Sequence, residues 1–138
     1  MSKIKYGFKT KPYKYQLRAL NKIKKLDGVA GLFMEMGTGK TKVAIDWAGI
    51  GYYNYDIKRV LVICPLSVIG VWQRQIKQHL PFFARVRALT GSTPERAAVI
   101  RRMIRSPQPT QDWLIINYEG IWRGEGRNRI EDLIEKWG

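Results

Sequence analysis

Residues 34–41, which read MEMGTGKT, have the types and the spacing that bind a nucleotide phosphate. Gly37 and Gly39 allow backbone angles and a close approach that a side chain would block. The successive N–H groups of such a loop point into one concavity and meet phosphate oxygens. Lys40 can reach the β- and γ-phosphates, and the Thr41 hydroxyl can ligate Mg²⁺. We therefore predict a nucleotide and Mg²⁺ site in which Lys40 and Thr41 are catalytic and these residues contact the cofactor: Met36, Gly37, Thr38, Gly39, Lys40 and Thr41.

The loop departs at one position from the general pattern G-x-x-x-x-G-K-[ST], because the first glycine of that pattern falls on Met34. What remains, G-x-G-K-T, lies between the apolar run 29–33 and a helix that we expect to begin near Lys40 and to continue through Ala48. The positive end of such a helix adds to phosphate binding. This context favours a phosphate loop over the alternative, which is an ordinary glycine turn.

Strands and helices alternate along the chain, and these elements must position the loop. The runs 59–64 and 113–117 are continuously apolar, as in strands covered on both faces, and 84–89 alternates. The order predicts an α/β fold, a parallel sheet flanked by helices, in which ligands bind beyond the carboxyl ends of the strands. We expect a loop over 51–58 and the following helices: Tyr13–Leu26, Val68–Leu80, one from a Ser92 cap with Pro94 to about Arg105, and Asn128–Trp137.

The composition is strongly basic, with 25 Lys and Arg against 11 Asp and Glu, a formal net charge of +14. Such a charge attracts polyanions, nucleic acid above all, whereas a merely soluble surface usually mixes both signs. One cysteine, Cys64, allows no disulfide within the chain and fits a reducing compartment. No apolar run approaches the roughly 18–20 residues of a membrane span. We expect a cytoplasmic protein, bacterial or in a phage-infected cell, with a single domain over 1–138 that begins with a basic extension, 1–12.

At these motifs the sequence resembles the first half of the N-terminal RecA-like lobe of superfamily 2 helicases. The nearest resemblance is to Swi/Snf-type DNA-dependent ATPases and their phage and bacterial relatives, and it spans Pro12 to Tyr118. In that family the first loop position is usually a small residue rather than glycine. Met34 therefore departs less from the family pattern than from the general phosphate-loop pattern. The segment Pro12–Gln16 resembles the family's P-x-x-x-Q element, which implies that Gln16 reads the adenine edge of ATP. The alternative for Gln16 is a surface residue on a helix.

Three further segments resemble elements that face nucleic acid in the family. The resemblance implies backbone contacts with DNA at Ser67 in Cys64–Ser67, at Gly91 in Leu89–Ser92, and at Tyr118. The alternative for Ser67 is a helix N-cap, and the alternative for Tyr118 is an ordinary strand end. His79 is the only histidine, which excludes a histidine-based metal cluster, and we expect a polar residue near a helix end.

The sequence lacks the Asp-Glu pair that holds Mg²⁺ and orients water at a strand end in superfamily 2. Asp112 precedes its expected strand instead of following it. We therefore expect truncation before that motif, with the remainder of the helicase core as a missing partner and no efficient hydrolysis by these residues alone. A natural stand-alone nucleotide-binding domain is the alternative.

Two other functions stay open on the sequence. One is a different P-loop NTPase or kinase, and the other is a non-catalytic basic module that binds nucleic acid with a degenerate loop. Adenine preference that depends on Gln16 favours the helicase-like ATPase, and salt-dependent DNA binding without ATP binding favours the basic module.

Overall fold

The computed structural model describes residues 6–25, 39–106, 110–117 and 126–137, with side chains in the last range from Asp132 onward. The chain divides into two compact units, one of Met1–Asp56 with Arg74–Pro81 and one of Ile57–Gln73 with Phe82–Gly138. The single domain over 1–138 with a basic extension stays a prediction.

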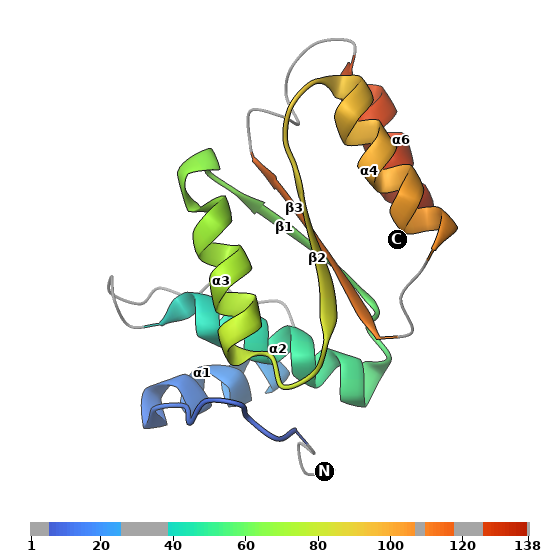
Figure 1. Cartoon of the computed structure of the whole chain (residues 1–138). Helices are drawn as coiled ribbons and strands as arrows, with labels where there is room; N and C mark the ends of the chain where they lie inside the picture. The colour runs from blue at the N-terminus through green and yellow to red at the C-terminus, as the bar shows by residue number, and fades with distance from the viewer. Residues whose placement is uncertain (1–5, 26–38, 107–109, 118–125, 138) are drawn as a thin grey trace. The chain divides into compact units, whose positions relative to one another are not determined.

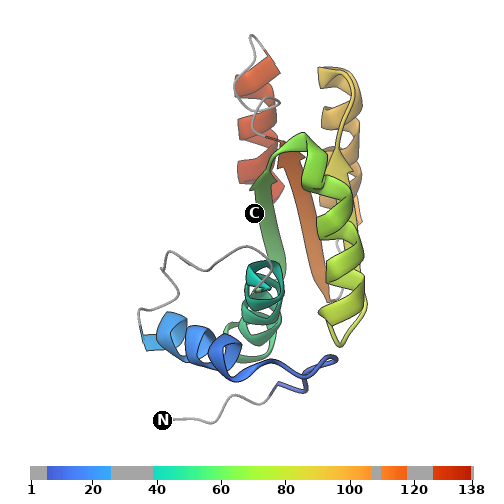
Figure 2. The same ribbon diagram turned by 90° about the vertical axis from the view of Figure 1, so that its left-hand side faces the viewer.

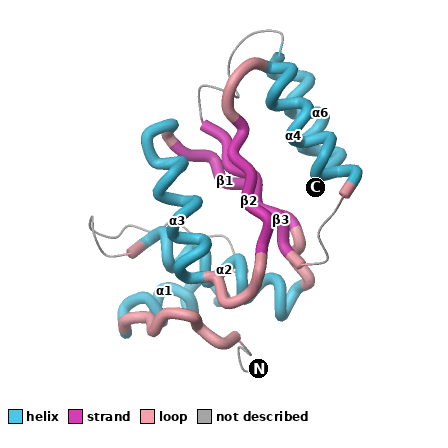
Figure 3. The backbone as a smooth tube through the Cα atoms, in the orientation of Figure 1, coloured by secondary structure: helices cyan, strands magenta, loops and turns pink. Residues whose placement is uncertain are grey.

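A parallel sheet of three strands forms the centre of the second unit (Figure 3). The strands are β1 (Arg59–Cys64), β2 (Ala84–Leu89) and β3 (Gln111–Asn117), in the order β1-β3-β2. β3 pairs in parallel with both neighbours, and all seven of its residues are buried. The strands predicted over 59–64, 84–89 and 113–117 are confirmed, and so is the α/β fold with a parallel sheet and flanking helices. The apolar run 29–33 before the phosphate loop lies outside the described residues.

Two helices of the second unit, α4 (Thr93–Arg105) and α6 (Gly126–Trp137), lie side by side (Figure 1). The Ser92 hydroxyl accepts from the Glu95 N–H at 3.4 Å before α4, which confirms the predicted cap. The side chains of α4 and α6 share one apolar core with β2 and β3, in which these residues are buried: Leu89, Ala97, Ile100, Met103, Leu114, Ile116, Leu133 and Trp137.

A buried ion pair joins β2 to β3 inside this unit. Arg85 and Asp112 face each other in the strand register, and the guanidinium donates to both carboxylate oxygens, at 2.7 and 2.9 Å. The same guanidinium reaches the Met103 carbonyl in the last turn of α4, at 3.4 Å. Asp112 is therefore a fully buried residue within β3, so its expected position ahead of the strand is wrong.

The first unit contains α1 (Lys14–Lys25) and α2 (Lys40–Tyr55), which pack beside each other (Figure 2). Among the apolar residues at helical spacing in α1, Leu20 and Ile23 are buried, whereas Leu17 is exposed. The loop predicted over 51–58 is wrong, because α2 continues to Tyr55. It ends at Asp56, whose backbone is left-handed and whose N–H donates to the Gly51 carbonyl.

The helix α3 (Ile69–His79) follows a 3-10 turn, η1 (Leu66–Val68), and begins close to the predicted start. Its residues up to Gln73 belong to the second unit and those from Arg74 onward to the first. Ile76, His79 and Leu80 are buried, so the end of α3 and the residue after it place apolar and polar groups in the interior of the first unit.

We predict that Asp112→Asn destabilises the chain by about 3–5 kcal/mol, because it leaves the Arg85 charge buried without its counter-charge. Urea unfolding followed by circular dichroism measures this difference. Asp132→Asn, on an exposed part of α6, is the matched control and is expected to change the unfolding free energy by less than about 0.5 kcal/mol. Equal stability of the two variants would contradict a structural role for the Arg85–Asp112 pair.

Candidate functional site

The end of the predicted phosphate loop meets the predicted adenine-reading residue within the first unit. Gly39, the residue before α2, has a left-handed backbone with φ 80°. A Cβ at this position would collide with the Nε2 atom of Gln16, so the end of that side chain would have to move, and the left-handed backbone itself favours glycine. The Oε1 atom of Gln16 accepts from the Tyr13 N–H at 2.8 Å, and the side chain is buried. Gln16 is therefore not the surface residue of the alternative interpretation.

Lys40 and Thr41 form the first turn of α2, as the sequence predicts. The first backbone bond of the helix runs from the Val43 N–H to the Gly39 carbonyl at 3.2 Å, so the preceding N–H groups have no partner within the helix. No acidic residue lies in that turn to compete with an anion, and Lys40 is exposed. These groups fit a nucleotide phosphate with Mg²⁺ near the Thr41 hydroxyl. Met36, Gly37 and Thr38 lie outside the described residues.

A buried polar network, which we call the Lys42–Asp46 clasp, holds the N-terminal segment on α2. The Lys42 ammonium lies 2.7 Å from the Asp46 carboxylate and donates to the Thr10 carbonyl at 3.0 Å. The Tyr6 hydroxyl donates to the other Asp46 oxygen at 3.2 Å, and the Thr10 hydroxyl lies 2.6 Å from Nδ1 of His79. These bonds fix the segment that leads into Pro12–Gln16, and so they help to place the Gln16 amide.

This clasp is not among the features predicted from the sequence. A lysine and an aspartate four residues apart on one helix face were the available signal, because residues at that spacing are neighbours. His79 is buried and hydrogen-bonded, which goes beyond the expectation of a polar residue near a helix end. The last turn of α3 thus helps to hold the N-terminal segment that contains Thr10.

Burial shifts the pKa values of the ionisable side chains in the clasp. It raises the pKa of the Asp46 carboxyl above its usual value, although the hydrogen bond and charge of Lys42 oppose the shift. The pKa of the Tyr6 hydroxyl is raised by burial and by the Asp46 charge. The pKa of His79 is lowered by burial and by the Lys42 charge, and Asp46 opposes this. His79 is therefore held neutral in the folded chain at neutral pH.

The candidate nucleic-acid contacts lie at the carboxyl edge of the sheet in the second unit. Ser67 is exposed in the turn η1 that follows β1, and Gly91 follows β2 with φ 84°. Parallel strands end at one edge, so both residues lie at the same edge as Asn117, where β3 ends. Ser67 lies within η1 and not directly before α3, which argues against the N-cap alternative. Tyr118 lies outside the described residues.

Two further groups lie at this edge, Arg96 from a basic cluster expected to face solvent and Asn117 from a strand end, and neither was predicted as a contact. Arg96 donates to the Gly91 carbonyl at 3.0 Å, which brings a cation to the turn. The Oδ1 atom of Asn117 is buried and has no hydrogen-bond partner among the described residues. The contact of Arg96 with Gly91 and the burial of Asn117 depend on the folded structure, and no hydrophobic pattern in the sequence predicts them.

A metal cluster built from protein ligands alone has no support in the described ranges. They contain no group of three or more His, Cys, Asp or Glu that could hold an ion. Asp112 forms an ion pair with Arg85, so it does not take the Mg²⁺-binding role of the Asp-Glu pair. Within the same ranges no helix is long and apolar enough to cross a bilayer.

We predict that His79 makes the chain less stable in weak acid. Its folded-state pKa lies below the unfolded value of about 6.5, so the unfolded chain binds the proton more readily. The free energy of unfolding should therefore fall as the pH drops below about 6.5, and the His79 contribution should be fully present above it. Urea titrations from about pH 8 to pH 5 measure this dependence.

The double variant Gln78→His/His79→Gln is the matched control, since it moves the only histidine to an exposed neighbouring position of α3. It should lose this part of the pH dependence. The same pH profile in the wild-type chain and the double variant would show that His79 is not buried neutral.

Comparison with known proteins adds an independent finding. The family model of the SNF2-related domain matches residues 15–137. The chromatin remodeling factor mit1 of Schizosaccharomyces pombe is 35% identical over 65 residues, which cover 47% of this chain and 4% of that protein. The TATA-binding protein-associated factor mot1 of the same organism is 26% identical over 113 residues, 73% of this chain and 5% of that protein. The chain thus spans a small part of the length of these relatives.

The matched region runs from the start of α1 to the end of α6, and it includes Gln16, the start of α2 and all three strands. The resemblance to the superfamily 2 Snf2 group is therefore confirmed, and the parallel sheet with its helices is part of the RecA-like α/β fold of this domain. Its assignment to a phage or bacterial type is not tested by two fission-yeast relatives. This chain belongs to the SNF2-related domain family.

Proposed function

We propose that this chain is the ATP-binding part of a DNA-dependent ATPase that moves along duplex DNA, of phage or bacterial type. The observation that carries the proposal is the contact of Gln16 with Gly39, directly before the helix that begins with Lys40 and Thr41. It brings an amide that both donates and accepts next to the start of a helix that can bind phosphate. A kinase-like P-loop protein has no need for this upstream amide.

Each residue has a distinct task in the proposed site. Gln16 recognises the adenine edge, Lys40 neutralises charge on the β- and γ-phosphates, and the Thr41 hydroxyl holds Mg²⁺. Mg²⁺ held by the Thr41 hydroxyl would offset the negative charge that develops on the phosphate. An acidic pair from residues outside this chain would complete the hydrolytic site, so the 138 residues bind nucleotide without efficient turnover.

The proposed DNA track follows the carboxyl edge of the sheet. Ser67, Gly91 and Tyr118 are its candidate contacts, and the Arg96 guanidinium beside Gly91 adds a cation to it. Hydroxyl and backbone N–H groups bind phosphates without reading sequence, as movement along DNA requires. The names of the relatives, a chromatin remodeling factor and a TATA-binding protein-associated factor, are in keeping with duplex DNA as the partner.

We predict that Lys40→Ala weakens Mg-ATP binding by roughly 10- to 100-fold, because it removes a charged hydrogen bond to phosphate worth about 1.5–3 kcal/mol. Isothermal titration calorimetry on the folded chain measures the affinity. Lys22→Ala, on the exposed side of α1, makes the same change in net charge and should bind ATP as the wild type does. Equal weakening by both variants would show that only the overall charge attracts ATP.

We predict that Gln16→Glu reduces the preference for ATP over GTP by roughly tenfold or more. The substitution keeps the shape of the side chain beside Gly39, but it removes the donor of the amide. The affinities of both nucleotides are measured by the same calorimetry, with thermal melting as the check of folding. An unchanged ratio would separate Gln16 from adenine recognition.

The basic nucleic-acid-binding module is the second candidate, and the net charge of +14 favours it. It requires salt-dependent DNA binding in a folded wild-type chain that shows no heat of ATP binding. That pair of results would overturn the ATPase proposal for this chain.

A further inference from the structure

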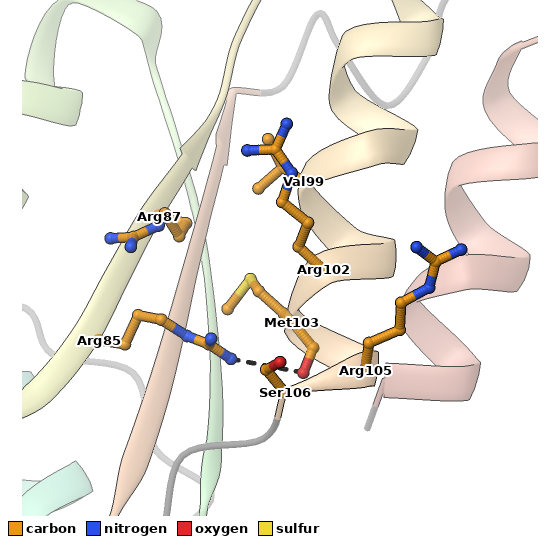
Figure 4. A pocket seen from close by; sticks show the side chains of 7 residues that line it. All are labelled: Arg85, Arg87, Val99, Arg102, Met103, Arg105 and Ser106. Carbon is orange, nitrogen blue, oxygen red and sulfur yellow. Dashed lines mark hydrogen bonds between the residues drawn. The ribbon is translucent and has the colours of Figure 1, made fainter.

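A cavity lined by arginines lies between β2 and the last turns of α4 in the second unit (Figure 4). Its volume is about 360 Å³. Four arginines line it, Arg85 and Arg87 from β2 and Arg102 and Arg105 from α4, together with Val99 and Met103. No acidic side chain is among its lining residues. We propose that this cavity binds an acidic peptide segment of a partner protein that carries an apolar side chain between its carboxylates.

The charges of the cavity are only partly neutralised. Asp112 takes up the charge of Arg85 through two hydrogen bonds. Within the described part of the chain, Arg87, Arg102 and Arg105 have no carboxylate partner, and all three side chains are exposed. Three cations around one small hollow favour an anionic ligand. Guanidinium groups suit carboxylates in particular, because their paired N–H donors match the two carboxylate oxygens.

The geometry of the lining defines what else the ligand must contain. Figure 4 shows Arg85 reaching across to the last turn of α4, and the Met103 side chain points toward the strand but is 1% exposed and belongs to the apolar core. Val99 lies one turn before Met103 on the same face of α4, which gives the cavity an apolar wall. Arg87 and Arg105 point away from the hollow in this view, and both are exposed, so binding as proposed requires that their side chains turn toward the peptide at the rim.

An apolar wall beside cations fits a peptide better than it fits DNA. The phosphates of a duplex lie on a convex surface, so they would meet the rim arginines but would leave the partly buried Val99 uncovered. A peptide with an apolar side chain between carboxylates fills both parts of the cavity. Recognition of acidic motifs by arginine clusters is a known mode of peptide binding.

The position of the cavity separates it from the proposed DNA track. Arg85 is the second residue of β2 and Arg87 lies near its middle, and Arg102 and Arg105 lie in the last turn of α4. Gly91 and the start of α4 lie at the opposite end of both elements, at the carboxyl edge. Basic residues in a last turn also complement the helix dipole, which accounts for Arg102 and Arg105 but not for Arg87 or for the hollow. The inference does not depend on the proposed ATPase function.

The test uses fluorescence anisotropy with a labelled peptide of alternating glutamate and leucine and the full 138-residue chain. Arg102→Glu should weaken binding of the peptide by about tenfold or more relative to Arg101→Glu. Arg101 is exposed on the same helix and does not line the cavity, so the two variants have the same net charge and differ only in position. Arg87→Ser, on the strand opposite, should weaken binding as well, and it provides a second variant if Arg102→Glu melts at a lower temperature.

Several results would overturn the proposal. Equal effects of Arg101→Glu and Arg102→Glu would mean that only the overall charge attracts the peptide. A peptide of alternating glutamate and serine that binds as tightly would exclude a role for Val99 and Met103. Random-sequence duplex DNA that displaces the peptide, and whose own binding is lost in Arg102→Glu but not in Arg101→Glu, would assign the cavity to the nucleic-acid backbone. No binding of the glutamate–leucine peptide to the wild-type chain would also reject the inference.

Discussion

The parallel pairing of β3 with both β1 and β2 is the constraint on which the second unit depends. Because all three strands run in the same direction, their carboxyl ends meet at one edge, and the turns that contain Ser67 and Gly91 are brought there without any direct bond between them. The same pairing places Arg85 opposite Asp112 at the other end of the strands. One arrangement of the backbone therefore creates both a possible phosphate-binding edge and a buried, neutralised cation far from it.

In the first unit, buried polar groups instead of strands position the segment that contains Gln16. The Lys42 ammonium is enclosed together with the Asp46 carboxylate, and the Thr10 carbonyl satisfies a further N–H of the ammonium. Buried charges require this kind of paired and hydrogen-bonded environment, because an isolated charge would be too costly to bury. The clasp follows Lys40 and Thr41 on the same helix, so the residues proposed to bind phosphate and those that anchor the Gln16 segment share one rigid element.

The sequence predicted the parts of the fold that rest on local signals. The strands 59–64 and 84–89 and the start of α4 at Ser92, Pro94 and Glu95 were found because apolar patterns and caps act over a few residues. Asp112 was placed outside its strand, since a charge in an apolar run reads as a boundary unless its Arg85 partner is known. The end of α2 was missed for a related reason. Gly49 and Gly51 suggest a loop, but Gly49 is needed where the Tyr6 ring lies against the helix, and a Cβ there would come within 2.6 Å of that ring.

The cations that make up the net charge fall into two groups, buried and exposed, and the two groups have different roles. Lys42 and Arg85 are internal and paired, so they contribute to packing and not to the attraction of ligands. Arg87, Arg102 and Arg105 are exposed around a hollow, and Lys40 is exposed at a helix start, so an anionic ligand can reach these cations. The two settings differ in what they select. In the functions proposed above, a helix start with an exposed lysine selects compact phosphates, whereas arginines beside Val99 select carboxylates joined to apolar groups. A uniform basic surface would not make this distinction, and for that reason position on the fold, more than the number of charges, determines which anions this chain can tell apart.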